Sequence, residues 1–117
     1  MSTISILLIT LVAIEHVYFL ILEMFLWTKP KGMKAFGLKS KEFAEQTKVL
    51  AANQGLYNGF LAAGLIFAVI QNGMQVAVFF LICVTIAGIY GSYSTKQIKL
   101  FYIQAVPAIL ALISCLF

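Results

Sequence analysis

The sequence predicts an all-α integral membrane protein, a four-helix antiparallel transmembrane bundle that forms a single domain over residues 1–117. Of these residues, 62% are hydrophobic and only 10% are charged, which is far more apolar than a typical soluble domain. A helix needs about 20 mainly apolar residues to cross a bilayer. Four runs approach this length, at about residues 4–27, 49–70, 75–93 and 99–117. Since lipid offers the backbone no hydrogen bonds, runs this long indicate helices rather than a barrel.

The first run, residues 4–27, is interrupted by Glu15, His16 and Glu23. It is longer than the apolar core of a cleaved signal peptide, and no small-residue cleavage site follows it. We therefore expect a permanent membrane helix. Trp27 closes the run, as tryptophans do at membrane interfaces.

The lysines predict the orientation. Six of the eight lie between the first and second runs, Lys96 and Lys99 lie between the third and fourth, and the turn at residues 71–75 has none. Because loops rich in lysine stay in the cytoplasm, loops 28–48 and 94–98 are predicted to be cytoplasmic and both termini to lie outside. This asymmetry explains the net charge of +4 without a nucleic-acid partner.

The connections contain recognisable helix boundaries. Pro30 and Gly32 are expected to follow the end of the first helix. A short segment at residues 33–38 is expected at the membrane surface. Ser40 is predicted to cap the second helix, which then begins in the headgroup region near Lys41. Pro107 is expected to interrupt the fourth helix, because proline lacks the backbone N–H of a helical residue.

The three polar residues of the first run are predicted to share one helix face. At 100° and 1.5 Å per residue, Glu15 and His16 lie together near the middle of the bilayer, and Glu23 lies about 11–12 Å closer to the cytoplasm. A mid-bilayer acid costs about 2.5–3.5 kcal/mol even on the lenient insertion scale. The cluster therefore favours a function over a purely structural hydrogen-bond network.

The second run offers a matching polar face. Its members are three amides and a tyrosine, namely Asn53, Gln54, Tyr57 and Asn58. We expect this face to meet the acids of the first helix and to form a pocket open to the cytoplasm. On the opposite side, Gly55 and Gly59 form a GxxxG stripe that permits close packing of helices.

Three functions remain open for this pocket. In the preferred one, it binds or transports a small amphipathic or cationic molecule, with Glu15 and His16 exchanging a proton near neutral pH. In the second, the protein is an intramembrane enzyme whose His16 and a glutamate perform acid/base chemistry on a lipid or isoprenoid. In the third, Gly55 and Gly59 dock a partner subunit. The preferred function needs no catalytic residue.

No cofactor or metal is expected, because the chain lacks HExxH or ExxH spacing. Cys83 and Cys115 lie at different depths of different runs, which argues against a disulfide. The expected partners are membrane lipid, a small amphipathic ligand and, as an open alternative, a second copy of the chain in a homodimer.

Three sequence motifs resemble a known family. These are AIEH at residues 13–16, EMFLW at 23–27 and ANQGLYNGFLAAGL at 52–65. The chain resembles a family of small bacterial inner-membrane proteins called domain of unknown function thirteen-oh-four. This resemblance implies a four-span, multi-pass protein of the bacterial inner membrane and supplies no activity. Looser analogies are the small multidrug resistance exporters, which carry an acid where Glu15 lies, and the sterol-isomerase-like membrane proteins.

Overall fold

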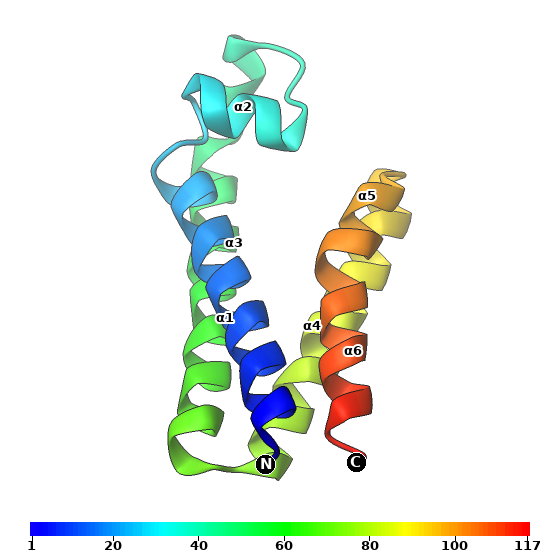
Figure 1. The fold of residues 1–117 in the computed structure, drawn as a ribbon. Coiled ribbons are helices and arrows are strands. Elements are labelled where there is room, and N and C mark those ends of the chain that lie inside the picture. Colours follow the sequence, from blue (N-terminus) through cyan, green and yellow to red (C-terminus); the bar gives the residue numbers. More distant parts are fainter. The chain divides into compact units, whose positions relative to one another are not determined.

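A computed structural model describes residues 1–117, and all of its regular elements are helical (Figure 1). The long helices are α1 (Thr3–Met24), α3 (Lys41–Gln71) and α4 (Met74–Thr95), and the short helix α2 (Pro30–Phe36) lies between α1 and α3. The chain ends with α5 (Ile98–Leu100), the π-helix η1 (Phe101–Ala105) and α6 (Val106–Ser114).

Three helices, α1, α3 and α4, are long and apolar enough to cross a membrane, as judged by length and composition. The segment Ile98–Ser114 is also apolar but shorter. The predicted all-helical class is therefore confirmed, and three helices rather than four reach membrane length. The end of the first helix differs from the prediction, because α1 ends at Met24, before Trp27. Helix α3 begins at Lys41, as predicted, ahead of the apolar run that starts at residue 49.

The chain forms two compact units, which we call the serine unit (residues 1–14 and 61–117) and the glutamate unit (residues 15–60). Helices α1 and α3 contribute residues to both units. Each name refers to a polar side chain that the unit buries, Ser5 in the first and Glu23 in the second.

The core of the serine unit is apolar and draws on four helices. Its fully buried members include Ile9 of α1, Leu65 of α3 and Leu81 of α4, and alanines fill much of the rest, including Ala108 and Ala111 of α6. The Ser5 and Ser114 hydroxyls are hydrogen-bonded across 3.0 Å and join α1 to α6. Small side chains thus bring these helices close together, since little volume separates their backbones.

The expected interruption at Pro107 takes the form of a π-helix. Pro107 lies in the first turn of α6, directly after η1. The Val106 N–H donates to the carbonyl of Phe101, five residues earlier, instead of the usual four. Gly88 of α4 lies against this turn, and a Cβ there would be 2.7 Å from the backbone nitrogen of Ala105. Glycine therefore lets α4 meet η1 backbone to backbone.

In the glutamate unit, α3 begins and α2 ends at residues typical of helix boundaries. Ser40 Oγ accepts a hydrogen bond of 3.0 Å from the Phe43 N–H, which confirms the predicted cap of α3. Helix α2 ends at Gly37, whose φ of 61° lies in the left-handed region, where glycine is favoured. The segment predicted to lie at the membrane surface, residues 33–38, thus forms the end of α2 and its cap.

Candidate functional site

The buried carboxylate of Glu23 is the centre of the glutamate unit. Glu23 lies in the last turn of α1 and is 1% exposed. The Gln54 side-chain amide donates to its Oε2 at 2.5 Å, and the Asn58 side-chain amide donates to its Oε1 at 2.5 Å. Both carboxylate oxygens are therefore satisfied, and both donors are neutral.

Helical geometry explains why these two amides act together. Gln54 and Asn58 are four residues apart on α3, so their side chains lie one above the other on the same face. Together they hold the two oxygens of one carboxylate from a single neighbouring helix, which fixes its orientation.

Glycines of α3 bring the amides within reach of α1. A Cβ at Gly55 would be 2.7 Å from Met24 Cγ and 3.1 Å from Glu23 Cβ, and a Cβ at Gly59 would be 2.7 Å from Leu20 Cδ1. The two backbones therefore approach more closely than any larger side chain would allow. The glycine stripe faces α1 on the same side as Gln54 and Asn58, whereas the sequence predicted it on the opposite side.

The predicted polar face of α3 is divided by this packing. Gln54 and Asn58 bind Glu23, whereas no such bond reaches Asn53 or Tyr57. Exposure does not separate the two pairs, because Gln54 is exposed like Asn53 and Tyr57. Successive helical residues differ by about 100°, so Asn53 and Tyr57 fall on the far flank of the face once Gln54 and Asn58 reach toward Glu23. The structure thus joins two of the four predicted residues of α3 to an acid of α1.

Glu15 and His16 have different surroundings. His16 is fully buried, and its ring makes an edge-on contact with the Phe19 ring at a centroid distance of 5.2 Å. Glu15 is half-buried, and its Oε1 is buried without a hydrogen-bond partner. The amides of Gln54 and Asn58 bind Glu23 and not Glu15. The acids therefore form two separate positions, about 12 Å apart along α1 at 1.5 Å per residue.

One residue of this arrangement was not predicted from the sequence. Leu20 lies against both Gly55 and Gly59, so α3 packs on this residue of α1. Its spacing of three residues from Glu23 places it on the same face of α1. This spacing could have identified Leu20 as a contact residue, but leucines are too common in the first run for one of them to be singled out.

Comparison with known proteins identifies the family. The family model described as "Protein of unknown function (DUF1304)" matches residues 10–116. The chain belongs to this family. It is also 33% identical over 120 residues to a Lactococcus lactis subsp. lactis (strain IL1403) protein, "Uncharacterized protein YpaA", with all of both chains covered. No solved structure matches. The family predicted from the three motifs is therefore confirmed.

Within this DUF1304 chain, the carboxylate of Glu23 is the group best placed to bind a proton or a cation. A carboxylate that accepts from two neutral amides is hydrogen-bonded but has no compensating positive charge beside it, because an amide supplies none. Such a group binds a proton or an external cation. No three His, Cys, Asp or Glu side chains gather closely enough to hold a metal ion.

Proposed function

We propose that this protein is a multi-pass protein of the bacterial inner membrane that binds a small cationic or amphipathic molecule at its buried acids and exchanges it for a proton. Helices α1, α3 and α4 and the segment Ile98–Ser114 form four antiparallel spans. The last of them has the minimum length of about 17 residues. The lysine loops lie in the cytoplasm and the termini outside, because lysines accumulate on one side of this arrangement.

The observation that carries this proposal is the pair of neutral donors on Glu23. A carboxylate placed among apolar helices needs a balancing positive charge. Its partners Gln54 and Asn58 do not supply one. A proton balances the charge when the ligand is absent, and a cationic ligand balances it when bound. Competition between proton and ligand for one carboxylate is the minimum requirement for exchange.

Glu15 adds a second proton-binding position deeper in α1. Its buried Oε1 has no hydrogen-bond partner, so protonation removes a negative charge that no neighbouring donor stabilises at that oxygen. In this proposal His16, one residue away on the same helix, exchanges that proton with Glu15. The ligand enters at Glu23, the acid nearer the lysine loops.

Proton release on ligand binding tests the function. The full chain is reconstituted in liposomes that contain a pH-sensitive dye, and tetraphenylphosphonium is added as a lipophilic cation. We expect proton release that is lost in Glu23→Gln and Glu15→Gln. The matched control is Glu45→Gln, which removes the same charge from an exposed position and should retain the release. Unchanged release in Glu23→Gln contradicts the proposal.

The two other functions stay predictions. A lipid-modifying enzyme predicts altered lipid species in extracts of cells that express the protein. A partner subunit docked through the glycine stripe has less surface available than the sequence indicated, because Leu20, Glu23 and Met24 of α1 already lie against Gly55 and Gly59. No specific contact favours either function over cation binding.

A further inference from the structure

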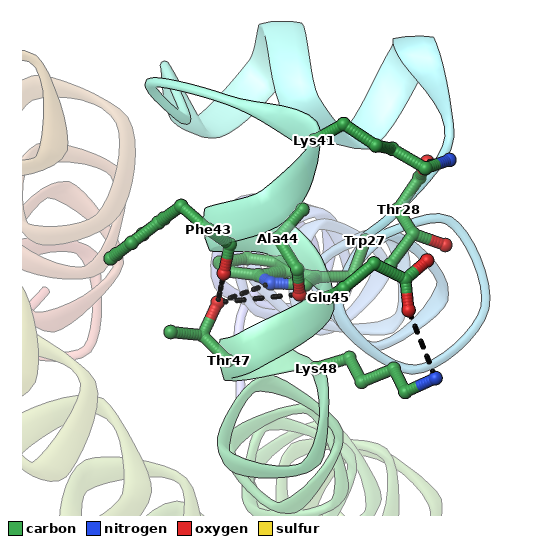
Figure 2. Close-up of polar contacts among 8 residues, drawn as sticks. All are labelled: Trp27, Thr28, Lys41, Phe43, Ala44, Glu45, Thr47 and Lys48. Atoms are coloured by element: carbon green, nitrogen blue, oxygen red, sulfur yellow. Dashed lines mark hydrogen bonds and ion pairs between the residues drawn. The ribbon is translucent and has the colours of Figure 1, made fainter.

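The segment between α1 and α3 forms an ordered, positively charged surface, which we call the lysine platform (residues 27–48). It contains α2 and the first two turns of α3. Trp27 Nε1 donates to Thr47 Oγ1 at 3.0 Å, and Thr47 Oγ1 donates to the Phe43 carbonyl at 2.7 Å (Figure 2). Lys41 Nζ donates to the Thr28 carbonyl at 2.7 Å. These bonds tie the chain that leaves α1 to the start of α3.

Helix α2 is held closely against the end of α1. A Cβ at Gly32 would be 1.9 Å from the Leu26 carbonyl oxygen, so only glycine fits. The Phe36 ring packs against the Trp27 indole with a centroid distance of 5.0 Å. The platform therefore presents its lysines from a fixed scaffold and not from a freely moving loop.

The lysines of the platform are mostly without acidic partners. All six are exposed, and the same segment contains only two glutamates. Lys48 pairs with Glu45 at 3.0 Å. The ammonium groups of Lys31 and Lys39 instead lie over aromatic rings, at 5.5 Å from the centroid of Tyr18 and 4.9 Å from that of Phe43. Strong positive charge thus remains available to an external anion.

We propose that the lysine platform binds the phosphate groups of anionic phospholipids at the membrane surface. Lysine ammonium groups bind phosphate as point charges. An ammonium that lies on an aromatic face still has donors for a phosphate, and the ring beneath it offers apolar contact to the rest of the lipid. Trp27 places the platform at the end of a membrane-length helix, where tryptophan marks the interface. The inference rests on the proposed membrane insertion and is independent of the acids.

Trp27 makes a direct test possible, because it is the one tryptophan of the chain and lies within the platform. The full chain is reconstituted in phosphatidylcholine vesicles that contain a minor fraction of phospholipid brominated in its acyl chains. This fraction carries either a phosphatidylglycerol or a phosphatidylcholine headgroup. Bromine quenches tryptophan fluorescence at close range. We expect phosphatidylglycerol to associate about fivefold more strongly, the factor that one lysine near an anionic surface supplies.

Three variants separate the platform from general charge. Lys34→Gln removes an exposed ammonium from α2, and Lys96→Gln removes one from the exposed residue that follows α4. The preference for phosphatidylglycerol should fall in Lys34→Gln, reach near unity in Lys31→Gln/Lys34→Gln, and persist in Lys96→Gln. An equal fall in Lys34→Gln and Lys96→Gln overturns the proposal. A salt series on the natural chain should also weaken the preference, because exposed charges are screened.

The same measurement distinguishes the remaining outcomes. Equal quenching by both brominated lipids overturns the headgroup proposal and leaves membrane insertion intact. Quenching by neither lipid contradicts insertion itself. Inorganic phosphate is added against chloride of the same ionic strength. Selective loss of the preference in phosphate identifies a site for free phosphate and overturns the assignment to lipid.

Discussion

The serine unit and the glutamate unit bury polar side chains in different ways. In the serine unit, the hydroxyl of Ser114 donates to the Ala111 carbonyl at 2.6 Å, and that of Thr85 donates to the Leu81 carbonyl at 2.8 Å. Both of these hydroxyls find an acceptor on their own helix, and the bond between Ser5 and Ser114 links two helices in addition. In the glutamate unit, Glu23 depends on two side chains of another helix.

The difference follows from the chemistry of the groups. A hydroxyl donates, and helix carbonyls accept a second hydrogen bond readily. An ionised carboxylate only accepts, and the N–H groups of a helix beyond its first turn are already used. A buried carboxylate therefore needs donors from a neighbouring helix. Pairing between two helices in the glutamate unit is a direct consequence of burying an acid there.

The largest expected effect comes from removing both donors of the glutamate unit. Gln54→Leu/Asn58→Leu leaves the Glu23 carboxylate buried and unpaired, and we expect the free energy of unfolding in detergent to fall by about 3 kcal/mol. Adding Glu23→Leu should recover at least half of this loss, because no unpaired group remains. Unfolding titrations in dodecyl sulfate, followed by circular dichroism, measure both values. A loss without recovery would show that the amides stabilise α3 independently of Glu23.

The next effect tests the close backbone contact of the serine unit. Gly88→Ala places a methyl group 2.7 Å from the Ala105 nitrogen, which belongs to backbone and cannot move aside cheaply. Overpacking of this kind costs about 2 kcal/mol. Gly91→Ala is the matched control on α4, since its Cβ would meet only Leu100 Cδ1, at 4.0 Å. Equal unfolding free energies in the two variants would argue against the contact between α4 and η1.

A smaller effect is expected from the hydroxyl link of the serine unit. Ser114→Ala removes the partner of Ser5 on α6 and should lower the free energy of unfolding by about 1 kcal/mol, within the range for hydrogen bonds between membrane helices. Ser94→Ala, at an exposed position, is the control and should have less effect. Indistinguishable titration midpoints for Ser114→Ala and the natural chain would contradict a stabilising link between α1 and α6.

The smallest effect on stability is expected at Glu45, an exposed acid with a charged partner, whereas Glu23 is buried and has neutral partners. A hydrogen bond from Lys48 and its positive charge lower the pKa of Glu45 from its ordinary value of 4.5. A lowered pKa stabilises the folded state above pH 4.5, and this contribution is lost as the pH falls through the folded pKa. The thermal midpoint of Glu45→Gln should therefore lie slightly below that of the natural chain at pH 7. The difference should disappear at strongly acidic pH, and a difference that grows on acidification would reverse the sign of this argument.

The helical class and most local boundaries were predictable because their causes are local. Hydrophobic run length identified the helices, and Ser40 marked the start of α3 through its cap. The π-helix before Pro107 was only partly predictable. Proline shows that a helix must be interrupted, but the form of the interruption depends on how closely Gly88 lets α4 approach Ala105.

The candidate site was predictable in its members but not in its pairing. The helical wheel placed Asn53, Gln54, Tyr57 and Asn58 on one broad face, and it could not show which half turns toward α1. Gly55 and Gly59 decide this, because α3 approaches α1 along its smallest side chains, and Gln54 and Asn58 lie beside them. The pairing of side chains between α1 and α3 depends on both helices, so the periodicity of one helix cannot predict it.

The hydrogen bonds of Glu23 also have a consequence for biosynthesis. Its two partners follow it by 31 and 35 residues in the chain. A growing polypeptide inserted in the proposed orientation therefore delivers α1 to the bilayer before Gln54 and Asn58 have left the ribosome. During that interval the acid must remain protonated or hydrated within the insertion machinery. When the acid stays hydrated there, we expect α1 to leave the insertion machinery together with α3.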